Sequence, residues 1–219
     1  RGQGTDRCKG MGQRVHVLDP FGVAMVDPVY RSGFNPLDAL DPTNPRSLDE
    51  AGRLADAIVI QNPQSNDPFW DQSARTLVKG LILHVLTDPM FESRRNLLTV
   101  RELIARGDHE GVRILREELG ENNPVGAQAL MWQGVSQNGA FGGKVAAVGE
   151  SMTSMLMNSP KQYESVLQVA NRNSEFLDSD GMEGVLSASD FKLSDLKTDA
   201  NGVSVYLSLP TRYMGEHFR

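Results

Sequence analysis

Residues 15–20 have the sequence VHVLDP, a short apolar run closed by an acidic residue and a proline. A run of this length before a turn signal predicts a buried β-strand over residues 15–18. Near the other end of the chain, residues 203–209 have the sequence VSVYLSL, in which apolar and small polar residues alternate before Pro210. This alternation predicts a second strand. Because two isolated strands make a marginal sheet, we expect both to belong to a larger α/β sheet.

The sequence between these two strands has the periodicity of helices. Apolar residues recur there at intervals of three and four, which predicts amphipathic helices. Ser47 with Glu50, and Thr99 with Glu102, have the spacing of a capping box at two helix starts. Polar breaks are predicted over residues 62–68 and 122–124, and the periodicity fades after Asn171. The predicted helices cover residues 47–59, 69–86, 99–104, 109–119, 125–136, 145–158 and 163–171.

This order of elements predicts the fold class. We expect a mainly α chain, in which a bundle of six to seven helices is inserted between short strands of an α/β sheet. Most of that sheet is expected to be missing from this chain. The predicted organisation is a strand and proline-rich segment at 1–46, an inserted all-α domain at 47–175, and a return segment with the second strand at 176–219.

The composition narrows the range of functions. The chain has 219 residues and a formal net charge of -6, whereas a protein that binds nucleic acid mainly through phosphate contacts is usually basic. The single cysteine, Cys8, excludes a disulfide within the chain and a cysteine metal cluster. No apolar run approaches the roughly 18–20 residues that span a bilayer. The chain begins with a polar segment and without Met, so we expect a piece of a longer protein or a processed form.

Sequence motifs for cofactors are lacking. A phosphate-binding loop needs Gly, four residues, then Gly-Lys and Ser or Thr. The nearest match, Gly142-Gly143-Lys144, has Asn138 and Val145 at the two other required positions, so it predicts a turn between helices instead. None of the histidines has a metal-ligand spacing, and structural roles are expected for them. The histidines are His16, His84, His109 and His217.

The densest basic stretch supplies the candidate contact residues. These arginines are Arg94, Arg95, Arg101, Arg106, Arg113 and Arg116. One interpretation is a set of solvated helix faces balanced by Glu102, Glu110, Glu117 and Glu118. The functional interpretation is a surface that contacts phosphate or an acidic substrate protein.

Four short stretches together carry a resemblance to a known family. They are Val15–Pro20, then Phe34-Asn35-Pro36-Leu37, then Asp67-Pro68-Phe69-Trp70, and finally Val205–Pro210. In this order and spacing the chain resembles the coupling proteins of conjugative and type IV secretion systems. The resemblance covers nearly the whole chain.

The resemblance implies a specific architecture. In that family a RecA-like nucleotide-binding domain carries an inserted all-α domain that is implicated in engaging the DNA–protein substrate. The family's Walker A and Walker B motifs lie upstream and downstream of the matching segments, so no ATP-binding or catalytic residue is assigned here. ATP and magnesium are expected to bind the full-length protein, and this chain alone is expected neither to hydrolyse ATP nor to bind it tightly.

The resemblance also implies a cellular setting. The full-length family member is a membrane-associated hexamer at the cytoplasmic face of the bacterial inner membrane. Its expected partners are a secreted protein or a relaxase–DNA complex, and other components of the secretion channel. No membrane-spanning segment is expected in this chain.

Two other classes of function remain open from the sequence. The chain could be a stand-alone helical adaptor that binds a partner protein, in which case residues 15–18 and 203–209 should be buried or capped within it. It could also be a small metal-independent enzyme that uses carboxylates. The candidates for that role are Glu150, Asp178 and Asp180, which lie in polar surroundings.

Overall fold

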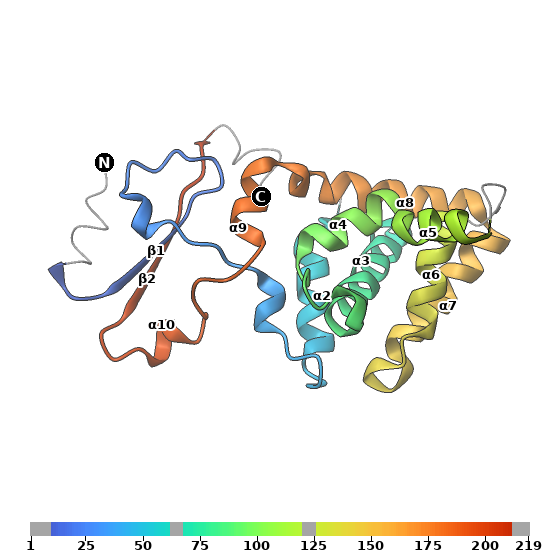
Figure 1. Ribbon diagram of the computed structural model, residues 1–219, viewed down its shortest axis with the longest axis horizontal. Helices are drawn as coiled ribbons and strands as arrows, with labels where there is room; N and C mark the ends of the chain where they lie inside the picture. Colours follow the sequence, from blue (N-terminus) through green and yellow to red (C-terminus); the bar gives the residue numbers. More distant parts are fainter. Residues whose placement is uncertain (1–9, 62–67, 120–125, 212–219) are drawn as a thin grey trace. The chain divides into compact units, whose positions relative to one another are not determined.

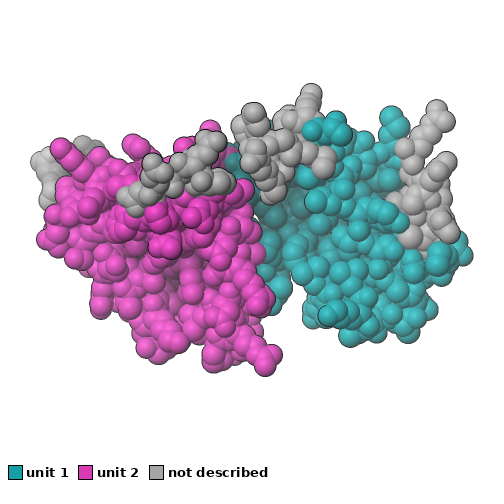
Figure 2. Space-filling view, turned by 180° about the vertical axis from the view of Figure 1, so that it is seen from behind, with its two compact units in different colours: residues 1–39, 96–98, 176–219 teal, residues 40–95, 99–175 magenta. Residues whose placement is uncertain are grey.

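The computed structural model describes residues 10–61, 68–119 and 126–211 (Figure 1). The chain forms two compact units, coloured separately in Figure 2. Unit 1 comprises residues 1–39, 96–98 and 176–219, and unit 2 comprises residues 40–95 and 99–175. Cys8, His217, the break at 122–124 and nearly all of the break at 62–68 lie outside the described residues. The predicted domain boundaries at 46 and 175 stay a prediction.

Both predicted strands are confirmed, and they pair with each other. β1 (Arg14–Leu18) and β2 (Val203–Leu207) form a parallel pair in which His16 lies opposite Val205. Parallel neighbours need a long crossover connection, because the chain must return to the same end of the sheet. Here the crossover contains every helix of unit 2, so the helices are an insertion between two adjacent strands.

Unit 1 covers both faces of β1. On one face Val15 and Val17 are buried against Ala24, Val26 and Tyr30 from the segment that follows the strand. On the other face the ring of His16 stacks on Phe191, with centroids 4.5 Å apart. The burial of both faces is typical of strands in parallel sheets.

Short helices continue after Asn171, where the helical periodicity of the sequence fades. α8 continues to Ser174, and it is followed by η4 (Glu175–Asp178), α9 (Asp180–Leu186) and α10 (Asp195–Thr198). These helices are too short to repeat an apolar pattern over two turns. Periodicity therefore carries little information about them. Two short 3-10 helices, η1 (Pro28–Tyr30) and η2 (Pro36–Ala39), occur in the proline-rich segment.

Unit 2 is a helical bundle, which confirms the mainly α fold class. Its central member is α3 (Phe69–Thr87), which contacts α2, α6, α7 and α8. Every residue from Gly80 to Leu86 is buried, because α3 has neighbours on several sides. Among the described residues, no helix is long and apolar enough to cross a membrane. The other helices are α2 (Ser47–Ile58), α4 (Leu97–Arg106), α5 (His109–Leu119), α6 (Ala127–Gln137), α7 (Ala140–Asn158) and α8 (Pro160–Ser174), with a 3-10 turn η3 (Pro89–Phe91).

Both predicted capping boxes were wrong, although the helices exist. Ser47 is the first residue of α2, and its hydroxyl donates to the carbonyl oxygen of Asp41 at 2.7 Å. Thr99 lies inside α4, and its hydroxyl donates to the carbonyl oxygen of Arg94 at 2.6 Å. In both cases a nearby loop supplies a backbone acceptor, and the hydroxyl bonds to it.

The turn predicted at Gly142-Gly143-Lys144 is confirmed. Phe141, Gly142 and Gly143 have φ angles of 53°, 67° and 83°, the left-handed region that glycine adopts without steric cost. These three residues form a kink within the first turn of α7. The close packing of α6 against α7 requires Gly149, since a Cβ at that position would lie 2.4 Å from the backbone nitrogen of Ser136.

The core of unit 2 contains a continuous hydrogen-bond chain. The indole Nε1 of buried Trp132 donates to the hydroxyl of Tyr163 at 2.7 Å, and that hydroxyl donates to Oε1 of Gln128 at 2.6 Å. The amide of Gln128 in turn donates to the carbonyl oxygen of Ile104 at 3.4 Å. Burial raises the pKa of Tyr163 to about 12. The chain joins α4, α6 and α8 without leaving the buried aromatic polar groups unpaired.

A second polar cluster surrounds the buried His84. The amide Nδ2 of Asn138 lies 3.0 Å from Nδ1 of His84 and also donates to the hydroxyl of Thr87 at 2.9 Å. The Oδ1 atom of Asn138 accepts from the backbone nitrogen of Ala140, which fixes the orientation of the amide. Because an amide nitrogen can only donate, Nδ1 of His84 is the acceptor in this arrangement and the ring is neutral.

We expect the stability of unit 2 to fall as the pH drops through the usual histidine pKa of about 6.5. Burial lowers the pKa of His84, and the nearby carboxylates of Asp88 and Asp108 only partly oppose this. The unfolded chain therefore binds the proton first, and stability present above pH 6.5 is lost below it, by up to about 1.4 kcal/mol per pH unit. Urea unfolding followed by circular dichroism at pH 7.5 and 5.5 measures this loss.

His84→Gln is the matched variant for this measurement, because it removes the titrating ring and keeps a polar side chain. It should have a smaller difference in unfolding free energy between the two pH values than the natural chain. An equal difference in both proteins would show that other groups, including His16, account for the pH dependence.

Candidate functional site

The candidate surface is built on α4 and α5, which are joined by a tight turn. Gly107 has a φ of +64°, and a Cβ there would lie 2.5 Å from the carbonyl carbon of Ala127. The next residue, Asp108, donates its backbone N–H to the carbonyl oxygen of Ala127 at 2.9 Å and accepts from the backbone nitrogen of Gly111 at 2.8 Å. The turn is therefore fixed against the start of α6, which determines where the arginines of both helices lie.

Two of the six predicted arginines are held by ion pairs on the surface. Arg94 donates to Glu102 at 3.1 Å and lies over the ring of Phe91, with 5.2 Å between the guanidinium carbon and the ring centroid. Arg113 contacts Glu110 and Glu117 on its own helix, and its Nε donates to Glu110 at 3.0 Å. Hydrogen bonding to Glu110 is the largest cause that raises the pKa of Arg113. For these two, the interpretation as balanced helix faces fits the structure.

Arg101 has a structural role. Its Nη1 atom donates to the carbonyl oxygen and Oδ1 of Asn171, at 3.2 and 2.9 Å, and to the hydroxyl of Ser174 at 3.1 Å. These contacts join α4 to the end of α8. Arg95, in the turn before α4, is half-buried. Arg101 is half-buried as well.

Arg106 and Arg116 remain as exposed cations. Arg106 is the last residue of α4 and Arg116 lies in the last turn of α5. Neither forms an ion pair or a side-chain hydrogen bond within residues 10–61, 68–119 and 126–211. Arg116 also lines a surface groove of about 850 Å³, together with His109, Val112, Arg113, Glu117 and Ala127.

The described residues offer no metal centre. They contain no group of three or more His, Cys, Asp or Glu side chains that could hold an ion. The three described histidines have structural surroundings: His16 contacts Ser32, His84 contacts Asn138, and exposed His109 lies 3.6 Å from Glu102. The carboxylates weighed as catalytic groups, Glu150, Asp178 and Asp180, are all exposed.

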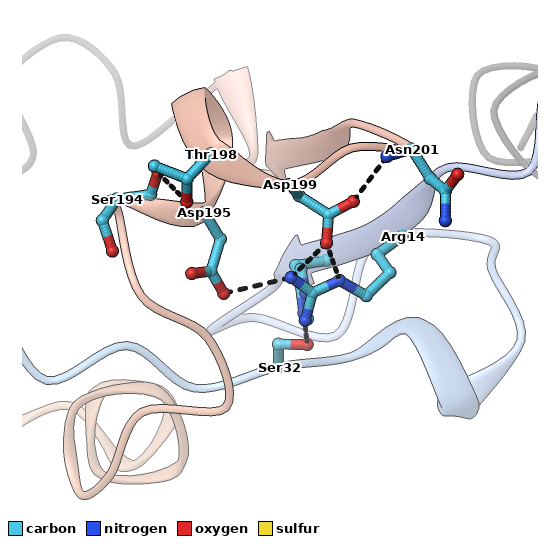
Figure 3. A network of polar contacts seen from close by, with 8 residues as sticks. Arg14, Ser32, Ser194, Asp195, Thr198, Asp199 and Asn201 are labelled. Carbon is cyan, nitrogen blue, oxygen red and sulfur yellow. Dashed lines mark hydrogen bonds and ion pairs between the residues drawn. The ribbon is translucent and has the colours of Figure 1, made fainter.

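An ion-pair cluster at the start of β1 was not visible in the sequence. Arg14 contacts Asp195 at 3.1 Å and Asp199 at 2.7 Å, and Asp199 also accepts from the backbone of Asn201 at 2.9 Å (Figure 3). The Asn201 bond is the largest cause that lowers the pKa of Asp199, and Arg14 adds to it. The cluster joins the first strand to the segment that leads into the second. No sequence signal could have revealed it, since its members are far apart in the chain.

β2 is only partly covered by the described residues. Val203, Ser204 and Val205 are half-buried, whereas Leu207 is 65% exposed. The outer edge of β2 has no strand beside it in the described part of the chain, since the sheet has the order β1-β2. An apolar strand with an open edge is a surface on which further strands pair.

These features define a class of protein, one in which a helical domain is inserted between adjacent parallel strands of an α/β sheet. The chain matches the family described as type IV secretory system conjugative DNA transfer over residues 6–217. It therefore belongs to that family, as the resemblance predicted. No curated protein matches the chain closely in sequence.

Proposed function

We propose that unit 2 is the substrate-engaging all-α domain of a type IV secretion coupling protein, an ATP-driven hexameric translocase at the cytoplasmic face of the bacterial inner membrane. The observation that carries this proposal is the parallel pairing of β1 with β2 around the helical insertion. That topology is the one expected when a motor's α/β core is interrupted by a separate helical domain. Membership of the conjugative DNA-transfer family supports the same interpretation.

The partly covered second strand favours this function over that of a stand-alone adaptor. An adaptor would bury β2 within itself, because an exposed apolar strand edge promotes aggregation. Leu207 is 65% exposed, and β2 has no second neighbour among the described residues. We infer that further strands of a RecA-like domain pair with this edge.

ATP and magnesium belong, in this proposal, to the rest of the nucleotide-binding domain. We assign no nucleotide-binding residue to this chain, because the glycines nearest to a phosphate-loop pattern form a kink at the start of α7. The role of the described residues is to bind and position the transferred substrate. The energy of transfer comes from ATP hydrolysis elsewhere in the protein.

Arg106 and Arg116 are the residues proposed to contact the substrate. Both are exposed, and both lack a partner among the described side chains that would have to be displaced. Arg94 and Arg113 already have carboxylate partners, so substrate contact would first cost those ion pairs. In a family that transfers DNA, the phosphate backbone of the relaxase-bound strand is the chemistry that two free guanidinium groups recognise.

In the full-length protein, the Arg106→Ser/Arg116→Ser variant should reduce DNA transfer between cells by at least about tenfold. Hydrogen bonds to charged groups are worth about 1.5–3 kcal/mol each, and two are removed. The matched control is Arg94→Ser/Arg113→Ser, which removes the same charge from surface ion pairs worth about 0–1 kcal/mol. The measurement is transfer frequency at equal protein levels, with circular dichroism confirming the fold of both variants.

Binding measurements with the purified chain distinguish contact with DNA from contact with a protein substrate. Its binding to a labelled single-stranded oligonucleotide should weaken in the Arg106→Ser/Arg116→Ser variant. The slope of the logarithm of the binding constant against the logarithm of the salt concentration should also become shallower, by about 0.7 for each lost phosphate contact. Equal transfer frequencies in the two double variants would show that Arg106 and Arg116 do not contact the substrate. Reduced transfer with unchanged oligonucleotide binding would assign them to a protein cargo instead.

A further inference from the structure

A second hollow lies in unit 1. Its volume is about 770 Å³, and it is lined by two segments that are far apart in the chain. The first segment contributes Phe34, Asp38 and Ala39, and the second contributes residues 189–195. Every lining residue belongs to unit 1. The proposed function does not use this hollow.

Phe34 and Phe191, which both line the hollow, belong to a stack of three rings. The buried Phe191 lies between His16 and Phe34, with centroid distances of 4.5 and 5.4 Å and interplanar angles of 26° and 25°. Phe34 is half-buried, lines the hollow and stacks on the buried Phe191. A ring held in this way by a buried neighbour presents a flat apolar surface with little freedom to move.

Two exposed carboxylates also line the hollow, and each is held by one hydrogen bond. Asp190 accepts from the backbone nitrogen of Gly33 through Oδ2 at 2.7 Å, and Asp38 accepts from the side-chain amide of Asn35 through Oδ1 at 2.9 Å. Each of these bonds holds one oxygen of the carboxylate. The second oxygens, Oδ1 of Asp190 and Oδ2 of Asp38, have no hydrogen-bond partner in the described part of the chain.

The charged side chains that line the hollow favour a positively charged ligand. Asp38, Asp190 and Asp195 contribute three carboxylates, and Lys192 is the single cation among the lining residues. Asp195 is engaged by Arg14, which leaves Asp38 and Asp190 against one lysine. A phosphate group would be repelled by this lining. A planar cation suits both the aromatic ring and the carboxylates of this hollow. Such a cation can stack on the face of the ring and donate hydrogen bonds to carboxylates in its own plane.

We propose that this hollow binds an arginine side chain on a partner polypeptide, with the guanidinium stacked on Phe34 and paired with Asp38 and Asp190. The exposed Leu193, which also lines the hollow, accommodates an apolar residue beside that arginine. Arginine fits better than lysine, since only the guanidinium is flat and donates from several nitrogens in a fixed geometry.

The test is an NMR titration of the isotopically labelled chain with the dipeptide acetyl-Arg-Leu-amide. Saturable shifts are expected in the amides of residues 34–39 and 189–195. The same dipeptide with citrulline, which keeps the shape and lacks the charge, should bind at least about tenfold more weakly. The affinity of the corresponding lysine dipeptide should lie between those of the arginine and citrulline dipeptides.

Some substitutions in the hollow should weaken binding of the arginine dipeptide, and one should strengthen it. Phe34→Leu should weaken binding roughly twofold to thirtyfold, the range that corresponds to a cation–π contact. Asp38→Asn and Asp190→Asn keep the oxygen that accepts the internal bond, and they should also weaken binding. Lys192→Gln removes the opposing charge and should strengthen binding. Asp180→Asn changes an exposed carboxylate on α9 that does not line the hollow, so it is the control and should leave the affinity unchanged.

Several results would overturn the assignment. Equal affinity for the arginine and citrulline dipeptides would exclude charge recognition. Saturation of the same amides by adenosine with comparable affinity would assign the ring stack to a nucleobase. No saturable shift at concentrations on the order of 10 mM, where even weak contacts are populated, would exclude an arginine site. Thermal unfolding of each variant confirms that a loss of binding does not arise from loss of the fold.

Discussion

Trp132→Ala should destabilise unit 2 by about 3–5 kcal/mol, the range measured when large buried aromatic residues are truncated. The side chain of Trp132 is 0% exposed, and it packs in α6 at the centre of the bundle. Its loss leaves a cavity and also removes the donor to the hydroxyl of Tyr163, a bond of 2.7 Å. Since a whole domain is stable by only about 5–15 kcal/mol, this is a large share of the total.

Urea unfolding followed by circular dichroism at 222 nm measures the loss. Trp132→Phe keeps most of the ring and removes the N–H, so it separates packing from hydrogen bonding. We expect Trp132→Phe to cost about 1–3 kcal/mol, the cost of a lost buried partner. The chain's other tryptophan, Trp70, is half-buried at the start of α3, and Trp70→Ala should cost less than Trp132→Ala. Equal losses at the two tryptophans would contradict the central position of Trp132.

Gly181→Ala should loosen unit 1, although alanine ordinarily favours a helix. Gly181 lies in α9, and a Cβ there would be 1.7 Å from the carbonyl oxygen of Pro20 and 2.7 Å from its carbonyl carbon. Both atoms belong to the backbone that follows β1, so α9 must move away. Overpacking of this kind costs typically about 1–3 kcal/mol, and the contact here is at the severe end.

The consequence for β1 can be measured directly. Movement of α9 also strains the 2.7 Å bond from the backbone nitrogen of Phe34 to the carbonyl oxygen of Val185. Hydrogen exchange of the amides from Arg14 to Leu18 should therefore be faster in Gly181→Ala, while the amides of α3 in unit 2 should exchange as before.

Gly184→Ala is the matched control for Gly181→Ala. It lies in the same helix, and a Cβ at this position meets no atom within 4 Å. The usual helix preference of alanine should then stabilise the chain by about 0.5–1 kcal/mol. If both substitutions shift the thermal midpoint in the same direction, the close approach of α9 to Pro20 does not limit the stability of unit 1.

The long helices could be predicted because their apolar patterns repeat along the chain. α3 is the clearest case, because the apolar stripe predicted for it is buried at every position from Ala74 to Val85. Details of their starts could not be predicted. Ser47 and Thr99 bond to Asp41 and Arg94, which lie in the preceding loops, and a capping pattern cannot reveal such competing acceptors.

The candidate site was predicted only as a set of arginines. The sequence places these arginines on neighbouring helices, but it does not say which of them have partners. Arg101 bonds to Asn171 and Ser174, roughly 70 positions further along the chain, so its structural role depends on the packing of α4 against α8. Arg106 and Arg116 are distinguished from the rest only by what does not contact them among the described residues.

The sequence by itself determined the long helices and the two strands, because each rests on residue types at short spacings, and it indicated the family through four short stretches in a fixed order. Tertiary structure alone decided that β1 and β2 pair in parallel, in a register with Arg14 opposite Val203. It also decided that two arginines are left exposed and that Phe34, Phe191 and His16 form one stack. The physical reason is that these contacts join residues whose separation along the chain carries no local pattern, and only packing of the folded chain brings them together.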